Sequence, residues 1–137
     1  MNQSRFFVNP WLNKKLDSSE FLKNKAVQEA WDVVNLVLAR EPPLPSKGDG
    51  GLYVGIGGIG YMCYHVARSP ICQSNKPFLV QKGIDYINAA LQFLEQNRGR
   101  RRDQCGFLLG ATGVYAVAAA LYHMAGLLHN GVSYISI

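Results

Sequence analysis

Hydrophobic positions recur with a helical period in four segments of the chain, which are separated by stretches rich in glycine, proline or arginine. Apolar residues return every three or four positions, as they do on one face of an α-helix. This spacing predicts helices at about 18–39, 57–67, 77–96 and 112–128. No confident strand pattern lies between them, and the weakly alternating VSYISI is too short to decide anything. The sequence therefore predicts an all-α protein.

Residue types at the predicted helix ends agree with these bounds. Asp17, followed three residues later by Glu20, forms a capping box for the first helix. The segment EPPLP ends that helix because proline cannot continue it. Ser69-Pro70 ends the second helix, and Pro77 is a favoured first-turn residue for the third.

A short glycine-bearing sequence occurs twice. GLYVGIGGIGYMCY begins at Gly51, and GFLLGATGVYAVAA begins 55 residues later at Gly106. The glycines that align are Gly51, Gly55 and Gly58 in the first copy and Gly106, Gly110 and Gly113 in the second. Each copy opens a helix that ends in Tyr-His, at Tyr64-His65 and Tyr122-His123. We expect a repeated unit of helix, glycine-bearing loop and helix, whose copies stack because neither buries its apolar face alone.

The first copy also contains Gly55-x-Gly57-x-x-Gly60, which matches the dinucleotide-binding fingerprint. That fingerprint needs a strand before its first glycine, whereas a loop after a long helix precedes it here. The second copy has threonine and tyrosine where the fingerprint needs glycine. We therefore predict that the glycines allow tight packing at a helix entrance, with a positive φ at Gly55, Gly57 or Gly58.

Composition describes a globular chain of 137 residues, 48% hydrophobic and 17% charged, which suits one domain at most. The net charge of +5 favours an acidic partner or a membrane surface but is too small to indicate nucleic acid, and we expect no nucleic-acid partner. Cys63, Cys72 and Cys105 have no C-x-x-C spacing, and the start of the sequence has no signal-peptide core. We expect a cytoplasmic protein, with peripheral attachment at the plasma membrane left open.

Two segments leave a membrane role open. The segment 107–128 is apolar, lacks charged residues and has the length of a bilayer span. Its similarity to the shorter 51–67 segment favours a buried helix instead. The basic stretch before it fits a solvated loop at a helix C-terminus, or it attracts an acidic peptide or anionic lipid. Its arginines are Arg98, Arg100, Arg101 and Arg102.

Three segments resemble the eukaryotic LanC-like (lanthionine synthetase C-like) family, which is related to the bacterial lanthionine cyclases. They are RFFVNP, GGLYVGIGGIGYMCYHVARSP and GFLLGATGVYAVAAALYH. The resemblance implies an α/α toroid of helical hairpins, of which residues 1–130 would form the N-terminal portion, followed by a divergent tail at 131–137. The glycines at the heads of the inner helices would then be structural. They are Gly51, Gly55, Gly57, Gly58, Gly106, Gly110 and Gly113.

The resemblance also implies zinc-assisted addition of the glutathione thiol to dehydroamino acids in proteins. The family's ligand motifs, which resemble Trp-Cys-His-Gly and Cys-His-Gly, do not occur here. Cys63 and His65 are two residues apart and point to different sides of a helix, so they cannot share a metal. We therefore assign no catalytic, cofactor-binding or metal-binding residue, and expect a fragment or truncated form. His65 and His123 are either structural or face the toroid's cavity.

Two classes of function remain at this point. The first is a peptide-modifying LanC-like protein whose active site lies beyond this chain. The second is a noncatalytic helical module that binds a protein partner or a membrane surface.

Overall fold

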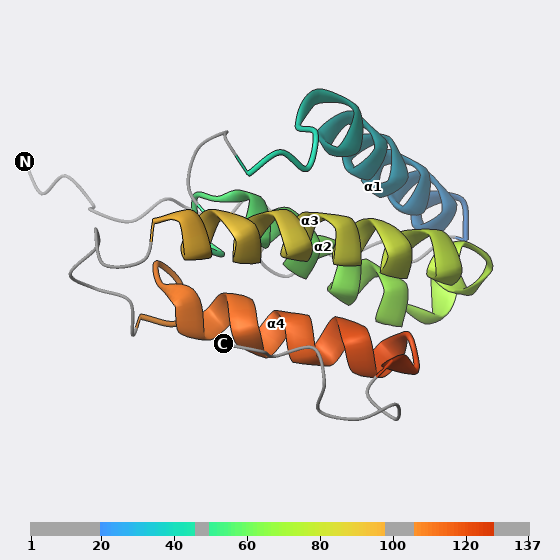
Figure 1. Cartoon of the computed structure of the whole chain (residues 1–137). Coiled ribbons are helices and arrows are strands. Elements are labelled where there is room, and N and C mark those ends of the chain that lie inside the picture. The colour runs from blue at the N-terminus through green and yellow to red at the C-terminus, as the bar shows by residue number, and fades with distance from the viewer. Residues whose placement is uncertain (1–19, 46–49, 98–105, 128–137) are drawn as a thin grey trace, which may run out of the picture. The chain divides into compact units, whose positions relative to one another are not determined.

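The computed structural model describes residues 20–45, 50–97 and 106–127 (Figure 1). Throughout these ranges the regular structure is helical, without a strand, so the all-α prediction is confirmed for this part of the chain. The elements are α1 at Glu20–Arg40, α2 at Ile56–Arg68, the short 3-10 helix η1 at Pro70–Asn75, α3 at Lys76–Gln96 and α4 at Ala111–Met124.

The helix bounds agree with the predicted ones to within two residues, except at the end of the fourth helix. That helix was predicted to reach residue 128 but ends at Met124. Gly126 follows with a φ of 72°, a left-handed conformation that glycine adopts without strain and that ends the helical path. Several sequence predictions fall outside the described residues. These concern the capping residue Asp17, RFFVNP, Arg98, Arg100, Arg101, Arg102, Cys105 and the tail 131–137.

The chain divides into two compact units within α1, Met1–Val33 and Val34–Ile137. In the first unit, the described part is a helix with mostly exposed side chains. Polar contacts one turn apart join its surface residues. Gln28 Nε2 donates to Asp32 Oδ1 at 3.0 Å, and Lys25 Nζ lies 3.9 Å from Glu29 Oε1. Exposed pairs of this kind stabilise a helix by only a few tenths of a kcal/mol.

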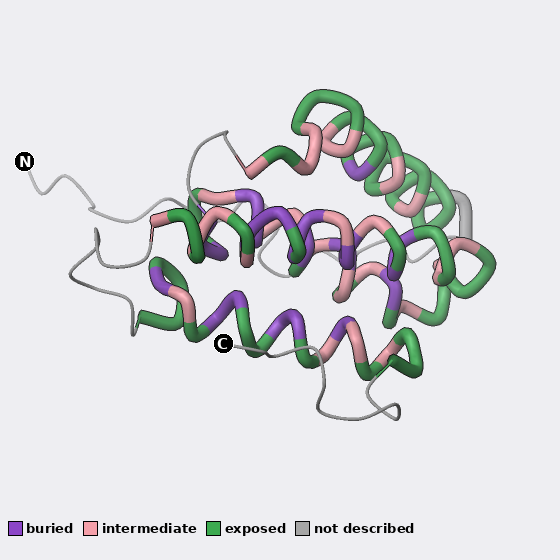
Figure 2. Tube along the Cα trace, viewed as in Figure 1, coloured by how far each residue is buried: buried purple, intermediate pink, exposed green. Residues whose placement is uncertain are grey.

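The core of the second unit forms where α3 packs against both α2 and α4. Figure 2 shows buried residues along all three helices. Because α3 has two neighbours, its buried positions cover more than one narrow stripe. The largest fully buried side chains are Cys63 on α2, Leu79, Tyr86 and Ile87 on α3, and Val114 and Leu121 on α4.

Glycines let the three helices of this core approach closely. A Cβ atom on Gly60 of α2 would lie 3.2 Å from the carbonyl oxygen of Gly83 on α3. A Cβ on Gly83 would lie 2.7 Å from Cδ2 of Leu121 and 3.3 Å from Cβ of Cys63. The side chain of Leu121 therefore occupies the space that Gly83 leaves open, next to α2.

Two tyrosine hydroxyls add polar contacts to α3. Tyr86 on α3 donates to the carbonyl oxygen of Glu41, the residue directly after α1. Tyr122 on α4 donates to Oδ1 of Asn88 on α3. The first bond joins α3 to the segment that precedes the first glycine-bearing turn. The second joins α3 to α4, the helix that follows the second glycine-bearing turn.

Candidate functional site

The two copies of the repeated sequence form two turns that are hydrogen-bonded to each other. The backbone N–H groups of Leu52 and Tyr53 both donate to the carbonyl oxygen of Leu108, each at 3.0 Å. α2 begins directly after the first turn and α4 directly after the second. α2 and α4 therefore start at the same end of the core, and α3 runs antiparallel to both (Figure 1).

The backbone has the same conformation where the two helices begin. Gly55 precedes α2 with φ −115° and ψ 176°, and Gly110 precedes α4 with φ −123° and ψ −175°. These are extended conformations, which any residue adopts. The positive φ predicted at Gly55, Gly57 or Gly58 is therefore wrong, and Gly126 is the glycine with a positive φ in the described part of the chain.

Close approach of a carbonyl oxygen explains the aligned glycines instead. A Cβ on Gly58 would lie 2.3 Å from the carbonyl oxygen of Leu52, and a Cβ on Gly113 would lie 1.9 Å from that of Phe107. Both distances are far below an ordinary contact, and both carbonyls belong to the residue six positions before the glycine. Gly57 has a similar role, since its Cβ would lie 2.6 Å from the carbonyl oxygen of Gly50.

The repeat in the sequence is thus a repeat in local structure, although the aligned glycines do not all have the same surroundings. Gly51 is buried at the beginning of the first turn. Gly106 is exposed, and a Cβ there would be 3.6 Å from the nearest atom, the backbone nitrogen of Gly110. Residues 52–54 form a turn rather than a strand, as expected for a helix entrance and not for a nucleotide-binding fold.

Large apolar side chains project from both turns into solvent. The exposed fractions are 74% for Tyr53, 65% for Val54, 51% for Phe107, 54% for Leu108 and 59% for Leu109. We call these five residues the turn surface. The sequence did not reveal it, because an apolar residue in a loop does not show by its type alone whether its side chain is buried or exposed. The available signal was that both copies place an apolar pair, Tyr53-Val54 and Leu108-Leu109, immediately before the last residue of the turn.

The histidines near the helix ends are exposed. The ring of His65 packs against Tyr61 with centroids 4.4 Å apart and against Tyr64 at 5.4 Å, both nearly perpendicular. The Arg68 guanidinium lies 5.4 Å from the centre of the Tyr64 ring and donates to its hydroxyl at 3.3 Å. His65 therefore belongs to an aromatic cluster on its own helix, and His123 lies exposed near the end of α4.

Cys63 is a core residue of the second unit. Its side chain is fully buried, and this burial raises the pKa of the thiol to about 11, although the Lys82 charge acts in the opposite direction. At neutral pH the thiol therefore stays protonated, the form that does not bind a metal. Over the described residues no group of three or more His, Cys, Asp or Glu side chains is placed to hold a metal ion.

The apolar fourth helix is shorter than the segment that suggested a bilayer span. α4 has 14 residues, whereas a span needs about 20. In the ranges that the structure describes, no helix is both long and apolar enough to cross a membrane.

No known protein-family model matches this chain, and no solved structure matches it.

Proposed function

We propose that this chain is a LanC-like protein of the peptide-modification family and that its helical hairpins form the N-terminal portion of an α/α toroid. One observation carries the proposal. The two turns share a backbone conformation, a carbonyl-over-glycine contact and a direct bond between them, at the heads of two helices that start at the same end. A toroid of inner and outer helices needs this relation between successive inner helices.

In this proposal α2 and α4 are inner helices, and α3 is the outer helix between them. The family's chemistry, addition of the glutathione thiol to dehydroamino acids, requires a zinc site with thiolate and imidazole ligands. Within the described part of the chain the residues do not fit that site, because Cys63 is buried with a raised pKa and His65 packs on Tyr61 and Tyr64. The chain would therefore serve as scaffold in the cytoplasm, and the zinc ligands would come from a C-terminal half.

An assembly experiment tests this proposal. The purified chain is mixed with a separately produced C-terminal half of a LanC-like protein that carries the Cys, Cys and His ligands. We expect a stable complex that adds glutathione to a dehydroalanine peptide in the presence of zinc, while the chain alone does neither. Gly58→Ala with Gly113→Ala should prevent assembly, and Gly106→Ala should not, because only the first two positions lie under a carbonyl oxygen.

Two results would contradict the proposal. One is the absence of any complex with the C-terminal half. The other is stoichiometric zinc binding by the chain alone that is lost on replacing Cys63 or His65, which would place a metal site where the geometry does not favour one.

A noncatalytic binding module is the second candidate function. The observation that favours it is the turn surface, whose five large apolar side chains are exposed to solvent and are not packed in the core. A module of this kind would bind its partner without zinc and without the C-terminal half.

A further inference from the structure

We propose that the turn surface docks the protein on an anionic lipid bilayer. Its residues are Tyr53 and Val54 from the first turn and Phe107, Leu108 and Leu109 from the second. This inference does not rest on the proposed function, since it is argued from the exposed side chains of these two turns alone.

The turns are held by backbone atoms, which leaves their side chains free to bind. The bonds between them join the N–H groups of Leu52 and Tyr53 to the carbonyl oxygen of Leu108. Each exposed side chain is therefore presented on a fixed backbone, so docking requires little ordering of the chain. Tyr53 is suited to the boundary between lipid and water, because its ring is apolar and its hydroxyl remains polar.

The chemistry of the two turns favours lipid over a protein partner. Residues 50–67 and 106–127 contain no Asp, Glu, Lys or Arg, so no formal charge in these ranges would need to leave water. Specific protein interfaces combine an apolar centre with a polar rim that fixes orientation. The exposed residues of the two turns offer one hydroxyl and otherwise only apolar side chains.

Positive charge in the sequence selects an anionic bilayer. The chain carries a net charge of +5, and four arginines precede Gly106 by four to eight residues. These arginines lie outside the described residues and are not part of the turn surface. Each basic residue close to an anionic membrane strengthens binding by about fivefold. The proposal therefore combines shallow insertion of apolar turns with electrostatic attraction.

Vesicle flotation of the full chain tests the proposal. We expect binding to phosphatidylcholine vesicles that contain about 30% phosphatidylserine, and much weaker binding to phosphatidylcholine alone. Leu108→Ser with Leu109→Ser should weaken binding by about tenfold or more, because two exposed apolar side chains are removed. The bond at Leu108 uses a backbone oxygen, so this variant should keep its helical circular dichroism.

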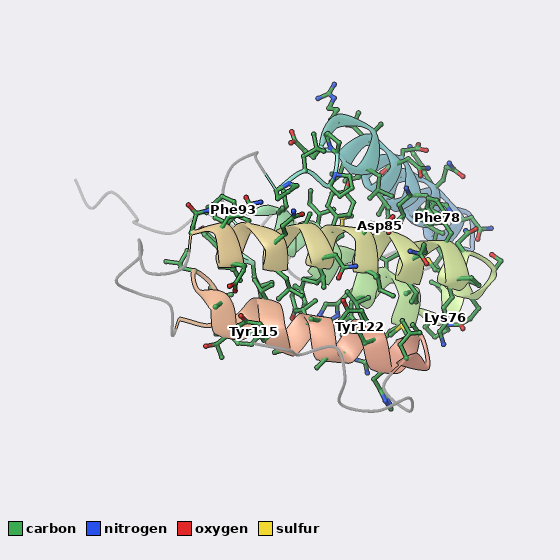
Figure 3. All side chains as sticks on the ribbon, in the orientation of Figure 1. Lys76, Phe78, Asp85, Phe93, Tyr115 and Tyr122 are labelled. Atoms are coloured by element: carbon green, nitrogen blue, oxygen red, sulfur yellow. The ribbon has the colours of Figure 1, made fainter. Side chains whose placement is uncertain are left out.

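A matched control removes two exposed apolar side chains elsewhere. Ile71 and Phe78 are 66% and 48% exposed. Figure 3 shows Phe78 and Phe93 near opposite ends of α3, and Phe93 is the one next to the turns, since its Cδ1 lies 2.9 Å from the Cβ position of Gly50. Ile71→Ser with Phe78→Ser should therefore leave vesicle binding unchanged.

A fluorescent label at the turn surface checks the mode of binding. In a Cys72→Ser, Cys105→Ser background, an environment-sensitive dye attached through Leu108→Cys should shift to the blue with anionic vesicles, and Cys63 stays unlabelled because it is buried. Raising the salt from about 0.1 to about 0.5 M should reduce binding.

Three results would overturn the proposal. The first is equal vesicle binding by the wild type and the Leu108, Leu109 variant. The second is binding that does not depend on phosphatidylserine. The third is self-association that this variant abolishes in a chain that binds no vesicles, which would assign the surface to a second copy of the protein.

Discussion

At Gly58 and Gly113 the backbone of a helix lies directly under a carbonyl oxygen. The same contact at the same place in both copies means that glycine is required there for space, whereas the sequence predicted a positive φ at Gly55, Gly57 or Gly58. An alanine methyl group at either position would force the turn away from the helix.

Gly58→Ala and Gly113→Ala should each lower the free energy of unfolding by about 2–4 kcal/mol. The displaced atom is part of the backbone and cannot change rotamer, and this outweighs the gain of about 1 kcal/mol from alanine's helix propensity. Urea denaturation measures the effect. Gly106→Ala is the control and should change stability by less than about 1 kcal/mol, since a Cβ there has only an ordinary contact at 3.6 Å. Equal losses at all three positions would show that the carbonyl contacts are unimportant.

The Cys63 thiol should make stability depend on pH in the alkaline range. Burial raises the pKa of Cys63 from 9.0 to about 11 in the folded protein. Between these values the unfolded chain ionises first and binds fewer protons, so the free energy of unfolding should fall as pH rises, by up to about 3 kcal/mol. Well below pH 9 the thiol is protonated in both the folded and the unfolded state, so it should not contribute to the pH dependence there.

Chemical denaturation at pH values from about 8 to about 11 checks this prediction. Cys63→Ala should be less stable at neutral pH because it leaves a cavity, but should lose less stability on going to alkaline pH. A residual decline is expected in this variant, since burial also raises the pKa of Tyr86. Parallel curves for the two proteins would contradict a buried, protonated thiol.

Within the second unit, α3 and α4 differ in how they are held. α3 packs against both α2 and α4, while α4 is Ala-rich and packs mainly against α3. Several of the residues of α4 that face away from this contact are exposed, Tyr115 among them at 53%.

Hydrogen exchange should therefore be slowest in α3 and faster in α4. α4 packs mainly against α3 and less closely against α2, whereas α3 lies between α2 and α4 and packs extensively against both, so the amides of α4 should open at a lower free energy than those of α3. Exchange measured by mass spectrometry at neutral pH should protect the peptide around Ile84–Ala90 more than the one around Val114–Leu121. Equal protection would show that α4 is as firmly held as the centre of the core.

Helix positions were predictable because apolar spacing and proline mark them locally. The end of α4 was not, since the apolar run continues past Gly126 and only the backbone conformation there shows that the helix has stopped. The relation between the turns was predictable in part. Aligned glycines indicated two similar loops, but the bond from Leu52 and Tyr53 to Leu108 joins residues far apart in the sequence. Exposure of the turn surface depends on the same arrangement, so it too required the structure.

For the whole molecule, the amount of exposed apolar surface should govern behaviour in solution. Large hydrophobic side chains are exposed on α2, α4 and the turns, as well as at Ile71 and Phe78. Monomeric proteins rarely keep large contiguous apolar patches in contact with water, and domains retain only about 5–15 kcal/mol of net stability. The chain on its own should therefore be marginally stable and prone to self-association.

Small-angle scattering and thermal melts over a range of concentrations test this prediction. We expect the apparent mass to rise with concentration and the melting transition to be broad and concentration-dependent. A compact monomer with one sharp, concentration-independent transition would show that the chain is a complete domain.

The bond between the two turns has a polarity. The first turn supplies two donors, the N–H groups of Leu52 and Tyr53, and the second supplies one acceptor at Leu108. The positions of the second turn that correspond to those donors are Phe107 and Leu108. A third turn built in the same way would present its acceptor to these two N–H groups, so the pattern extends from each hairpin to the next in a single direction. A linear assembly of such hairpins would leave a turn with an unpaired carbonyl acceptor at one end and a turn with unpaired N–H donors at the other. Closing the assembly into a ring would pair these two ends with each other.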